Sequence, residues 1–320
     1  MKEERGAKEI AIVSENFSGQ NLVDADAVRE YRRASKADET KRAFAKNWKA
    51  FEAWCQAAGA IAFPCSPQVL EAYLVHLAKR GLRTASIDQA CWAVDTAHRT
   101  AGRPAPGASE QVRVVLAGIR RTIGRPQHRK AALTIEHLRR ISFPDDLIGR
   151  RDKALLLVGF AGGLRRSELA GLQVSQVEET PFGLRLHLER SKTDQEGQGQ
   201  FVEIVRARTP DCCPVEALRA WLAAARIESG PVFRSITRWG RPGARLSTVS
   251  IGRLVKDAAA ACGLDPAQFG AHSLRAGCAT YLLDQGVPLN VVAKQGRWKK
   301  ADTVLRYDRN ATGTALVGVY

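Results

Sequence analysis

Apolar side chains recur at helical spacing through residues 39–124, and this pattern predicts a domain of four helices. In the first helix, which starts near Lys41, Phe44, Trp48 and Phe51 share one face while cationic side chains occupy the others. The three helices that follow are expected at 68–80, 84–100 and 110–123. Breaks rich in proline and glycine separate them, since proline lacks a backbone donor and glycine tolerates turn conformations. The aromatic side chains are interpreted as core residues rather than as platforms for DNA bases.

The hydrophobic pattern changes in the segment 134–320, which is expected to form a second, mixed α/β domain that is mostly helical. A continuous apolar run at 154–160 predicts a buried helix that ends at the glycine pair after it. Alternation of apolar and polar residues at 184–188 and 201–205 predicts two strands that pair as a hairpin. Helices are expected again at 214–227 and 249–262. The fold class expected for the whole chain is therefore mainly α with a small antiparallel β-sheet.

Two polar segments flank the first predicted domain. Residues 1–38 lack a sustained apolar period and are interpreted as an N-terminal arm. Residues 125–133 contain Pro126 and several cations, which is typical of a linker that follows a DNA backbone. Cations around this junction form the predicted DNA-binding set: Arg120, Arg121, Arg125, Arg129 and Lys130. An ordinary solvated surface is the alternative interpretation, since most charge runs are only that.

The charge balance adds a polyanionic partner to this picture. The 320 residues include 49 Lys and Arg against 33 Asp and Glu, a formal net charge of +16. In a chain without low-complexity runs, this excess favours nucleic acid over a membrane surface. No apolar stretch is long enough to span a bilayer and the first residues lack a secretory pattern, so a cytoplasmic protein on the bacterial nucleoid is expected. Seven cysteines without a C-x-x-C pair predict neither a disulfide framework nor a metal site.

Four short blocks carry side chains suited to holding and cutting a phosphodiester. They are Gly163-Leu164-Arg165, Ser191-Lys192-Thr193, His272-Ser273-Leu274-Arg275, and the segment from Arg297-Trp298 to Arg306-Tyr307. The planar guanidinium of arginine can donate to two phosphate oxygens at once, which a lysine ammonium does less well. His272 and Arg275 lie three apart at the expected start of a helix, so both project from one face near its positive end. The blocks together predict a phosphate site.

In order and spacing these blocks resemble the tyrosine recombinases, also called the phage integrase family, from about residue 40 to Tyr307. The resemblance implies that Arg165 and Arg275 clamp the phosphate, with Glu168 steadying the first arginine. It also implies roles for the remaining groups: Lys192 as general acid to the leaving 5′ oxygen, His272 as an acid/base or phosphate hydrogen-bonding group, Trp298 as a hydrogen-bond donor that packs the site, and Tyr307 as the nucleophile.

Two assignments within the blocks require a choice. Tyr307 is preferred over the tyrosines that lie in predicted helices, in the arm or at the chain end, namely Tyr31, Tyr73, Tyr281 and Tyr320. Arg297 departs from the resemblance because it directly follows Gly296, where many relatives place the histidine. Counting back from the nucleophile assigns that position to Trp298. Arg297 is retained as a contact to a DNA phosphate.

The resemblance implies a site-specific recombinase or integrase, of the kind found on mobile genetic elements, that works through a 3′-phosphotyrosyl intermediate. Neither ATP, a metal nor another cofactor is expected, because positive side chains supply the charge stabilisation. The implied partners are double-stranded DNA and further copies of the chain, a homotetramer on two DNA sites; an accessory directionality factor is left open. The tail at 311–320 is mildly strand-forming and is a candidate for docking on a neighbouring protomer.

Three other functions are compatible with parts of the pattern. A type IB topoisomerase shares the implied chemistry, although the four-helix first domain favours a recombinase. A catalytically silent DNA-binding regulator on the same fold would be basic and helical but would not need the full set of reactive groups. A metal-dependent nuclease is disfavoured because no compact carboxylate cluster stands out in the sequence.

Overall fold

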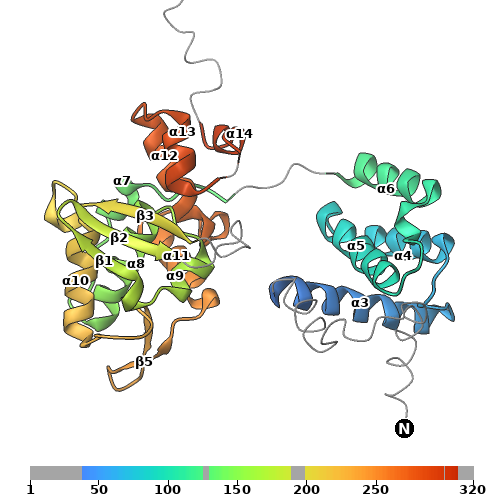
Figure 1. The fold of residues 1–320 in the computed structure, drawn as a ribbon, viewed down its shortest axis with the longest axis horizontal. Helices are drawn as coiled ribbons and strands as arrows, with labels where there is room; N and C mark the ends of the chain where they lie inside the picture. The colour runs from blue at the N-terminus through green and yellow to red at the C-terminus, as the bar shows by residue number, and fades with distance from the viewer. Residues whose placement is uncertain (1–37, 125–129, 189–198, 299, 309–320) are drawn as a thin grey trace, which may run out of the picture. The chain divides into compact units, whose positions relative to one another are not determined.

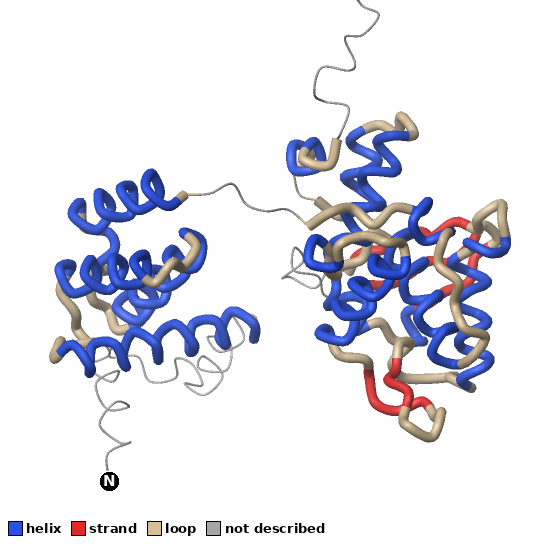
Figure 2. Tube along the Cα trace, turned by 180° about the vertical axis from the view of Figure 1, so that it is seen from behind, coloured by secondary structure: helices blue, strands red, loops and turns tan. Residues whose placement is uncertain are grey.

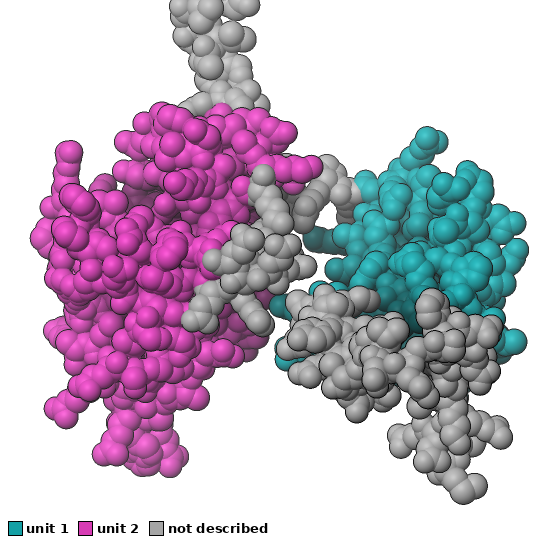
Figure 3. Space-filling view, in the orientation of Figure 1, with its two compact units in different colours: residues 1–127 teal, residues 128–320 magenta. Residues whose placement is uncertain are grey.

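The computed structural model describes residues 38–124, 130–188, 199–298 and 300–308, in two compact units, Met1–Gln127 and His128–Tyr320 (Figures 1 and 3). The predicted arm before Asp38, the linker residues 125–129 and the tail after Asp308 lie outside the described residues, as does Lys192. The boundaries predicted for these segments stay predictions. Within the described part of the chain, no helix is long and apolar enough to cross a membrane.

Unit 1, as described over residues 38–124, is a bundle of helices. It contains α3 (Asp38–Ala58), α4 (Pro67–Lys79), α5 (Thr84–Thr100), the 3-10 helix η2 (Pro106–Ala108) and α6 (Glu110–Ile123). Ser66 and Ser109 cap α4 and α6, because each hydroxyl accepts the backbone N–H of the residue three positions later. Phe51 is fully buried, and Trp48 and Trp54 pack against the same core. The helical pattern and the core role of these aromatic side chains are confirmed.

Unit 2 is built around α8 (Leu147–Ala161), the predicted buried helix. Asp146 caps it by accepting the N–H of Gly149 at 2.7 Å, and every residue from Ala154 to Phe160 is buried. It packs against α7 (Ile135–Arg139), α10 (Pro214–Ala225) and α12 (His272–Asp284). After α8 the chain turns at Gly163, whose φ of +51° is a left-handed conformation that favours glycine, and enters α9 (Arg166–Gly171).

A three-stranded antiparallel sheet packs against the same core. Its strands are β1 (Val177–Thr180), β2 (Gly183–Leu188) and β3 (Gln200–Val205), in that order. Leu184 lies opposite Ile204 and Leu186 opposite Val202, and all four side chains are buried. The predicted hairpin is therefore confirmed, and its register places the apolar positions of both strands on one face. β1 was not predicted, because its sequence VEET has a single apolar residue.

A second hairpin, β4 (Arg234–Ile236) with β5 (Pro242–Arg245), was also not predicted. It projects from the end of unit 2 opposite α13 (Leu289–Gly296) and α14 (Asp302–Leu305), as Figures 1 and 2 show. The chain continues into α11 (Thr248–Ala261). Short 3-10 helices join other elements: η3 (Val174–Gln176), η4 (Pro210–Cys212) and η5 (Pro266–Gln268). The fold class predicted from the sequence, mainly α with small antiparallel sheets, is confirmed.

Candidate active site

Arg165 lies between the glycine turn and α9, where two interactions with Glu168 hold it. Its backbone N–H and its Nη1 each donate to the Glu168 carboxylate at 2.7 Å, so the carboxylate also caps the start of α9. The Arg165 side chain is 18% exposed. Its neighbour Arg166 is exposed. Only the first arginine of this pair therefore belongs to the cluster described below.

Arg297 shares the Glu168 carboxylate with Arg165. Its Nη2 donates to Glu168 Oε2 at 2.7 Å, and the two side chains are 4% and 3% exposed. The same guanidinium donates to the carbonyls of Gly162 at 3.1 Å and Gly163 at 3.2 Å. The Arg297 carbonyl in turn accepts from Arg165 Nη2 at 3.2 Å. These bonds tie together the turn after α8, the start of α9 and the end of α13.

This environment gives Arg297 its partners within the protein, and its predicted contact with a DNA phosphate stays a prediction. The side chain is buried and its terminal nitrogens face Glu168 and backbone carbonyls. Its backbone has a φ of +56°, a left-handed conformation that costs a non-glycine residue about 1 kcal/mol. The residue is therefore a buried support of the site. The one sequence signal for this role is Glu168, an acidic residue at a buried helical position that requires cationic partners.

Arg275 lies on α12 with only 2% exposure. Its Nη1 donates to the carbonyl of Gly163 at 2.7 Å, the same carbonyl that accepts from Arg297. Its Cζ lies 4.0 Å from the centroid of the Trp298 ring, a cation–π contact. The ring in turn covers Gly296, where an added Cβ would lie 1.6 Å from a Trp298 carbon. Glycine at this position therefore allows the indole to stack on the guanidinium.

Tyr307 follows α14 and meets His272, the first residue of α12. The distance between His272 Nε2 and the Tyr307 hydroxyl oxygen is 2.8 Å. The Tyr307 ring centroid lies 5.4 Å from that of Trp298. The Thr280 hydroxyl, also on α12, donates to the Tyr307 carbonyl at 3.3 Å. The phenol is thus held through its oxygen, its ring and its backbone.

Burial and positive charge set the proton affinities of the cluster. Burial first, and then the charges of Arg275 and Arg165, lower the pKa of His272 below its ordinary 6.5, so the ring is neutral at pH 7 and can accept a proton. Burial and the neighbouring Arg165 and Arg297 lower the pKa of Arg275 to about 9, which still leaves it charged. Burial raises the pKa of Glu168, but Arg297 and Arg165 outweigh it and the net pKa is lowered.

The structure brings five of the six predicted catalytic residues into this cluster: Arg165, His272, Arg275, Trp298 and Tyr307. The described members of the predicted DNA-binding set lie in both units. In unit 1, Arg120 pairs with Asp88 at 2.7 Å and Arg121 is exposed. In unit 2, Lys130 is exposed and donates to the Ala267 carbonyl at 2.7 Å. The sixth catalytic residue and two DNA-binding residues lie outside the described residues: Lys192, Arg125 and Arg129.

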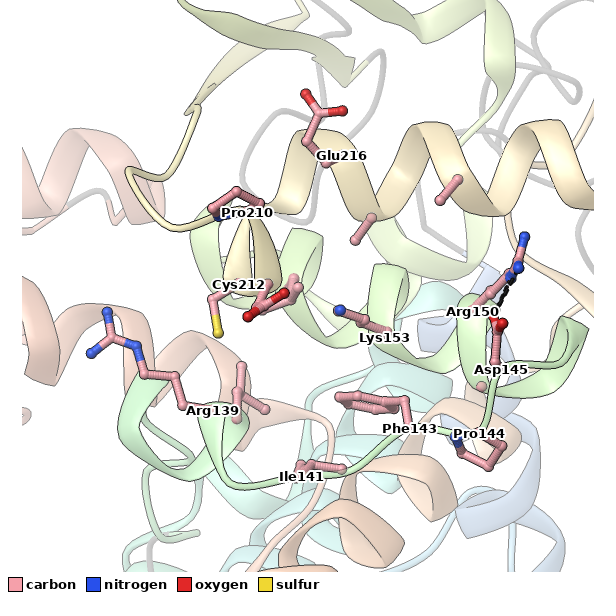
Figure 4. A pocket seen from close by; sticks show the side chains of 16 residues that line it. Arg139, Ile141, Phe143, Pro144, Asp145, Arg150, Lys153, Pro210, Cys212 and Glu216 are labelled. Carbon is pink, nitrogen blue, oxygen red and sulfur yellow. Dashed lines mark hydrogen bonds and ion pairs between the residues drawn. The ribbon is translucent and has the colours of Figure 1, made fainter.

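A separate cavity of about 620 Å³ opens between α7, α8 and α10 (Figure 4). Its lining mixes apolar side chains such as Phe143 with charged ones such as Lys153, and Arg150 is paired with Asp145 at 2.7 Å. None of the predicted catalytic residues lines it. Among the described residues, no group of three or more His, Cys, Asp or Glu is placed to hold a metal ion. The arginine cluster, rather than this cavity, is therefore the candidate active site.

Known proteins share this sequence pattern and fold. Residues 133–313 match the model of the phage integrase family. The chain is 36% identical over 280 residues to an integrase/recombinase xerD homolog of Selenomonas ruminantium, covering 85% of this chain and 82% of that protein. It is 26% identical over 284 residues to the recombinase cre of Escherichia phage P1, covering 82% and 81%. Its fold resembles that of the Tn1549 transposon integrase in complex with transposon right end DNA, with a TM-score of 0.60 and 16% identity over 92% of this chain and 96% of that one.

Proposed function

The chain belongs to the phage integrase family, and we propose that the cluster around Tyr307 is where it cuts and rejoins DNA strands. Its activity is site-specific recombination of the tyrosine recombinase type. The observation that carries the proposed site is the 2.8 Å contact between the Tyr307 hydroxyl and His272, beside Arg165 and Arg275. The relatives named above are integrases and recombinases, which favours this activity over a topoisomerase or a silent regulator.

In the proposed first step, the Tyr307 oxygen attacks a DNA phosphorus and His272 Nε2 takes the phenol proton. An O–P bond to tyrosine forms and the bond from phosphorus to the 5′ oxygen breaks, which leaves a 3′-phosphotyrosyl link. Lys192 protonates the departing 5′ oxygen. In the second step, the 5′ hydroxyl of another strand attacks the phosphorus and gives its proton to the neutral Lys192. The bond from phosphorus to Tyr307 breaks, and His272 returns the proton to the phenol. Each step exchanges one phosphoester for another, so no energy source is required.

Arg165 and Arg275 would pair with the non-bridging phosphate oxygens, where negative charge grows during each step. Donors that are already held in place stabilise that charge without reorganising, and removing one costs about 100-fold or more in rate. The bonds to Glu168 and to the Gly163 carbonyl supply this preorganisation. Arg297 acts through Glu168 and the glycine turn, and is therefore a positioning residue. Trp298 positions Arg275 and Tyr307 by stacking.

Double-stranded DNA is the proposed partner of both units. The net charge of +16 supports it, as does the likeness of the fold to an integrase whose structure contains transposon end DNA. Unit 1 and the cations Arg120, Arg121, Arg125, Arg129 and Lys130 would contact the phosphate backbone. We further infer a homotetramer on two DNA sites, located on the bacterial nucleoid and acting without a metal or other cofactor. An accessory directionality factor would be a separate protein.

Covalent capture tests the proposed nucleophile. Wild-type protein, Tyr307→Phe and Tyr281→Phe are mixed in EDTA with labelled duplexes taken from both sides of the gene, then separated on a denaturing gel. Tyr281 is the matched control, since it packs against Phe160 in the core of unit 2. A DNA–protein adduct is expected from wild type and Tyr281→Phe alone, while all three retain DNA on a native gel. An adduct that persists in Tyr307→Phe would contradict the assignment.

A further inference from the structure

The β4–β5 hairpin carries an unusual concentration of positive charge outside the active site. The segment from Ser229 to Lys256 contains five arginines and one lysine, with no Asp or Glu. Arg238, Arg241 and Arg245 are exposed. None of the three belongs to an ion pair found among the described residues. Arg219, a half-exposed arginine of the same unit, instead pairs with Glu179 and Glu216.

The framework of the hairpin is made by residues other than these arginines. The Thr237 N–H donates to the Arg241 carbonyl at 2.9 Å, and the Gly240 N–H donates to the Thr237 carbonyl at 3.0 Å. The Ser235 hydroxyl donates to the Ala244 carbonyl at 3.1 Å. At the base, the Leu246 N–H donates to the carbonyl of the buried Phe233. The tip is therefore held by its backbone and by small side chains, and the arginine side chains are available to a ligand.

Trp239 is the second unusual feature of the tip. Its side chain is 72% exposed, although a tryptophan normally buries most of its surface. Arg238 lies over one face of the ring, with Cζ 4.4 Å from the centroid. This contact restrains both side chains. An exposed apolar ring flanked by three cations that form no ion pair within the described part of the chain fits a ligand that offers both negative charge and flat apolar surface. The phosphates, sugars and base edges of DNA offer both.

We propose that the tip of the β4–β5 hairpin is a second DNA-contacting site, in which Arg241 and Arg245 pair with phosphates and Trp239 packs against sugar and base edges in a groove. The hairpin projects from the end of unit 2 opposite α13 and α14 (Figures 1 and 2). It therefore meets the duplex away from the phosphate that Tyr307 attacks. The inference rests on the proposed function, because it requires DNA to be the partner.

The salt dependence of DNA binding distinguishes contacts to phosphates from contacts to sugars and bases. Binding of a fluorescein-labelled duplex of arbitrary sequence is measured by anisotropy over a series of salt concentrations. Each lost phosphate contact lowers the slope of log affinity against log salt by about 0.9 for duplex DNA. The double variant Arg241→Gln with Arg245→Gln is therefore expected to have a slope shallower by about 2 than wild type. Trp239→Ala is expected to keep the slope and weaken binding about tenfold at every salt concentration.

Two control variants sit on the same unit. Arg219→Gln removes an exposed arginine that already has carboxylate partners, and Phe182→Ala removes an aromatic ring that is 78% exposed. Both are expected to match wild type in slope and affinity. If the double variant has the same slope as Arg219→Gln, the hairpin does not touch DNA phosphates and a protein partner becomes the better occupant. Adduct formation by the wild-type protein is measured in parallel. If wild type forms no adduct while the double variant still has a shallower salt slope than wild type, the result counts against Tyr307 as the nucleophile and not against the hairpin as a DNA contact.

Discussion

The arginines around Glu168 and those of the β4–β5 hairpin are the same residue type in opposite environments. Arg297 is 4% exposed, and its two terminal nitrogens donate to a carboxylate and to backbone carbonyls. Arg241 is exposed on a hairpin that contains no acidic residue. A buried guanidinium must be paired within the protein, because an unpaired charge in the interior is costly. An exposed guanidinium needs no partner within the protein, because water solvates it.

The difference separates two tasks that a DNA-cutting protein has to perform. The buried arginines hold other groups of the site in place, and the fold depends on them. The exposed arginines add affinity, and the fold does not depend on them. Substitutions in the first region should therefore change stability or rate, whereas substitutions in the second should change the salt dependence of binding. Two predictions test the first region of this division, and a third tests the proton acceptor beside it, in order of decreasing effect.

The largest effect is expected for Glu168→Gln. The change removes the one carboxylate that pairs with both Arg165 and Arg297, and leaves a buried guanidinium without a counter-charge. Breaking a buried ion pair by removing one partner costs about 3–5 kcal/mol. The free energy of unfolding, measured by urea titration, should fall accordingly and adduct formation should be lost. Glu179→Gln, in an exposed pair with Arg219, should leave the urea midpoint nearly unchanged. Equal urea midpoints for the two variants would contradict the distinction between the buried and the exposed ion pair.

Replacing each partner of Glu168 by lysine sharpens the comparison within the site. Arg297→Lys should lower the free energy of unfolding by about 2 kcal/mol, because an ammonium cannot reproduce the bonds to the carboxylate and the two glycine carbonyls. Arg165→Lys should instead slow adduct formation about 100-fold with a smaller change in stability. Single-turnover capture at saturating DNA and urea titration measure the two quantities. The opposite ranking would mean that Arg297 contacts the phosphate.

The smallest effect concerns pH. His272 has a folded pKa below 6.5, so the unfolded chain takes up a proton first as the pH falls. The contribution of this residue to stability is therefore present above pH 6.5 and is lost as the pH drops through the folded pKa. Adduct formation should likewise persist below pH 6.5, because the neutral ring still accepts the phenol proton. His272→Gln supplies the reference for both profiles. If the rate of adduct formation decreases as the pH is lowered, and the midpoint of that decrease lies above pH 6.5, the neutral histidine is excluded as the proton acceptor.

The elements with a regular period could be predicted from the sequence. The apolar face of 110–123 and the alternation of 184–188 each extend over enough residues to show one repeat clearly, and both elements lie where they were expected. The strands β1, β4 and β5 could not be predicted, because they have three or four residues and few apolar ones. Their strand geometry comes from pairing with neighbours rather than from a local preference.

The site could be predicted only as a set of residues. Arg165 and Tyr307 are named by their motifs, but the distances between groups before α9, on α12 and after α14 depend on how the helices pack. The role of Arg297 was missed for the same reason. Its motif places it beside Trp298, yet its left-handed backbone and its bonds to Glu168 turn its side chain into the interior. No local sequence pattern indicates the bond between Arg297 and Glu168, which lie 129 positions apart.

The contact between His272 and Tyr307 joins two residues of one polypeptide. α12 carries the proposed proton acceptor at its first turn and, at Thr280, a hydroxyl that donates to the backbone carbonyl of the proposed nucleophile. Under the proposed mechanism, one copy of the chain therefore supplies both the arginines and the tyrosine that cut a given strand. In an assembly of several copies, a subunit with a defective site would then leave its own DNA strand uncut, because a neighbouring subunit would not supply the tyrosine for that strand.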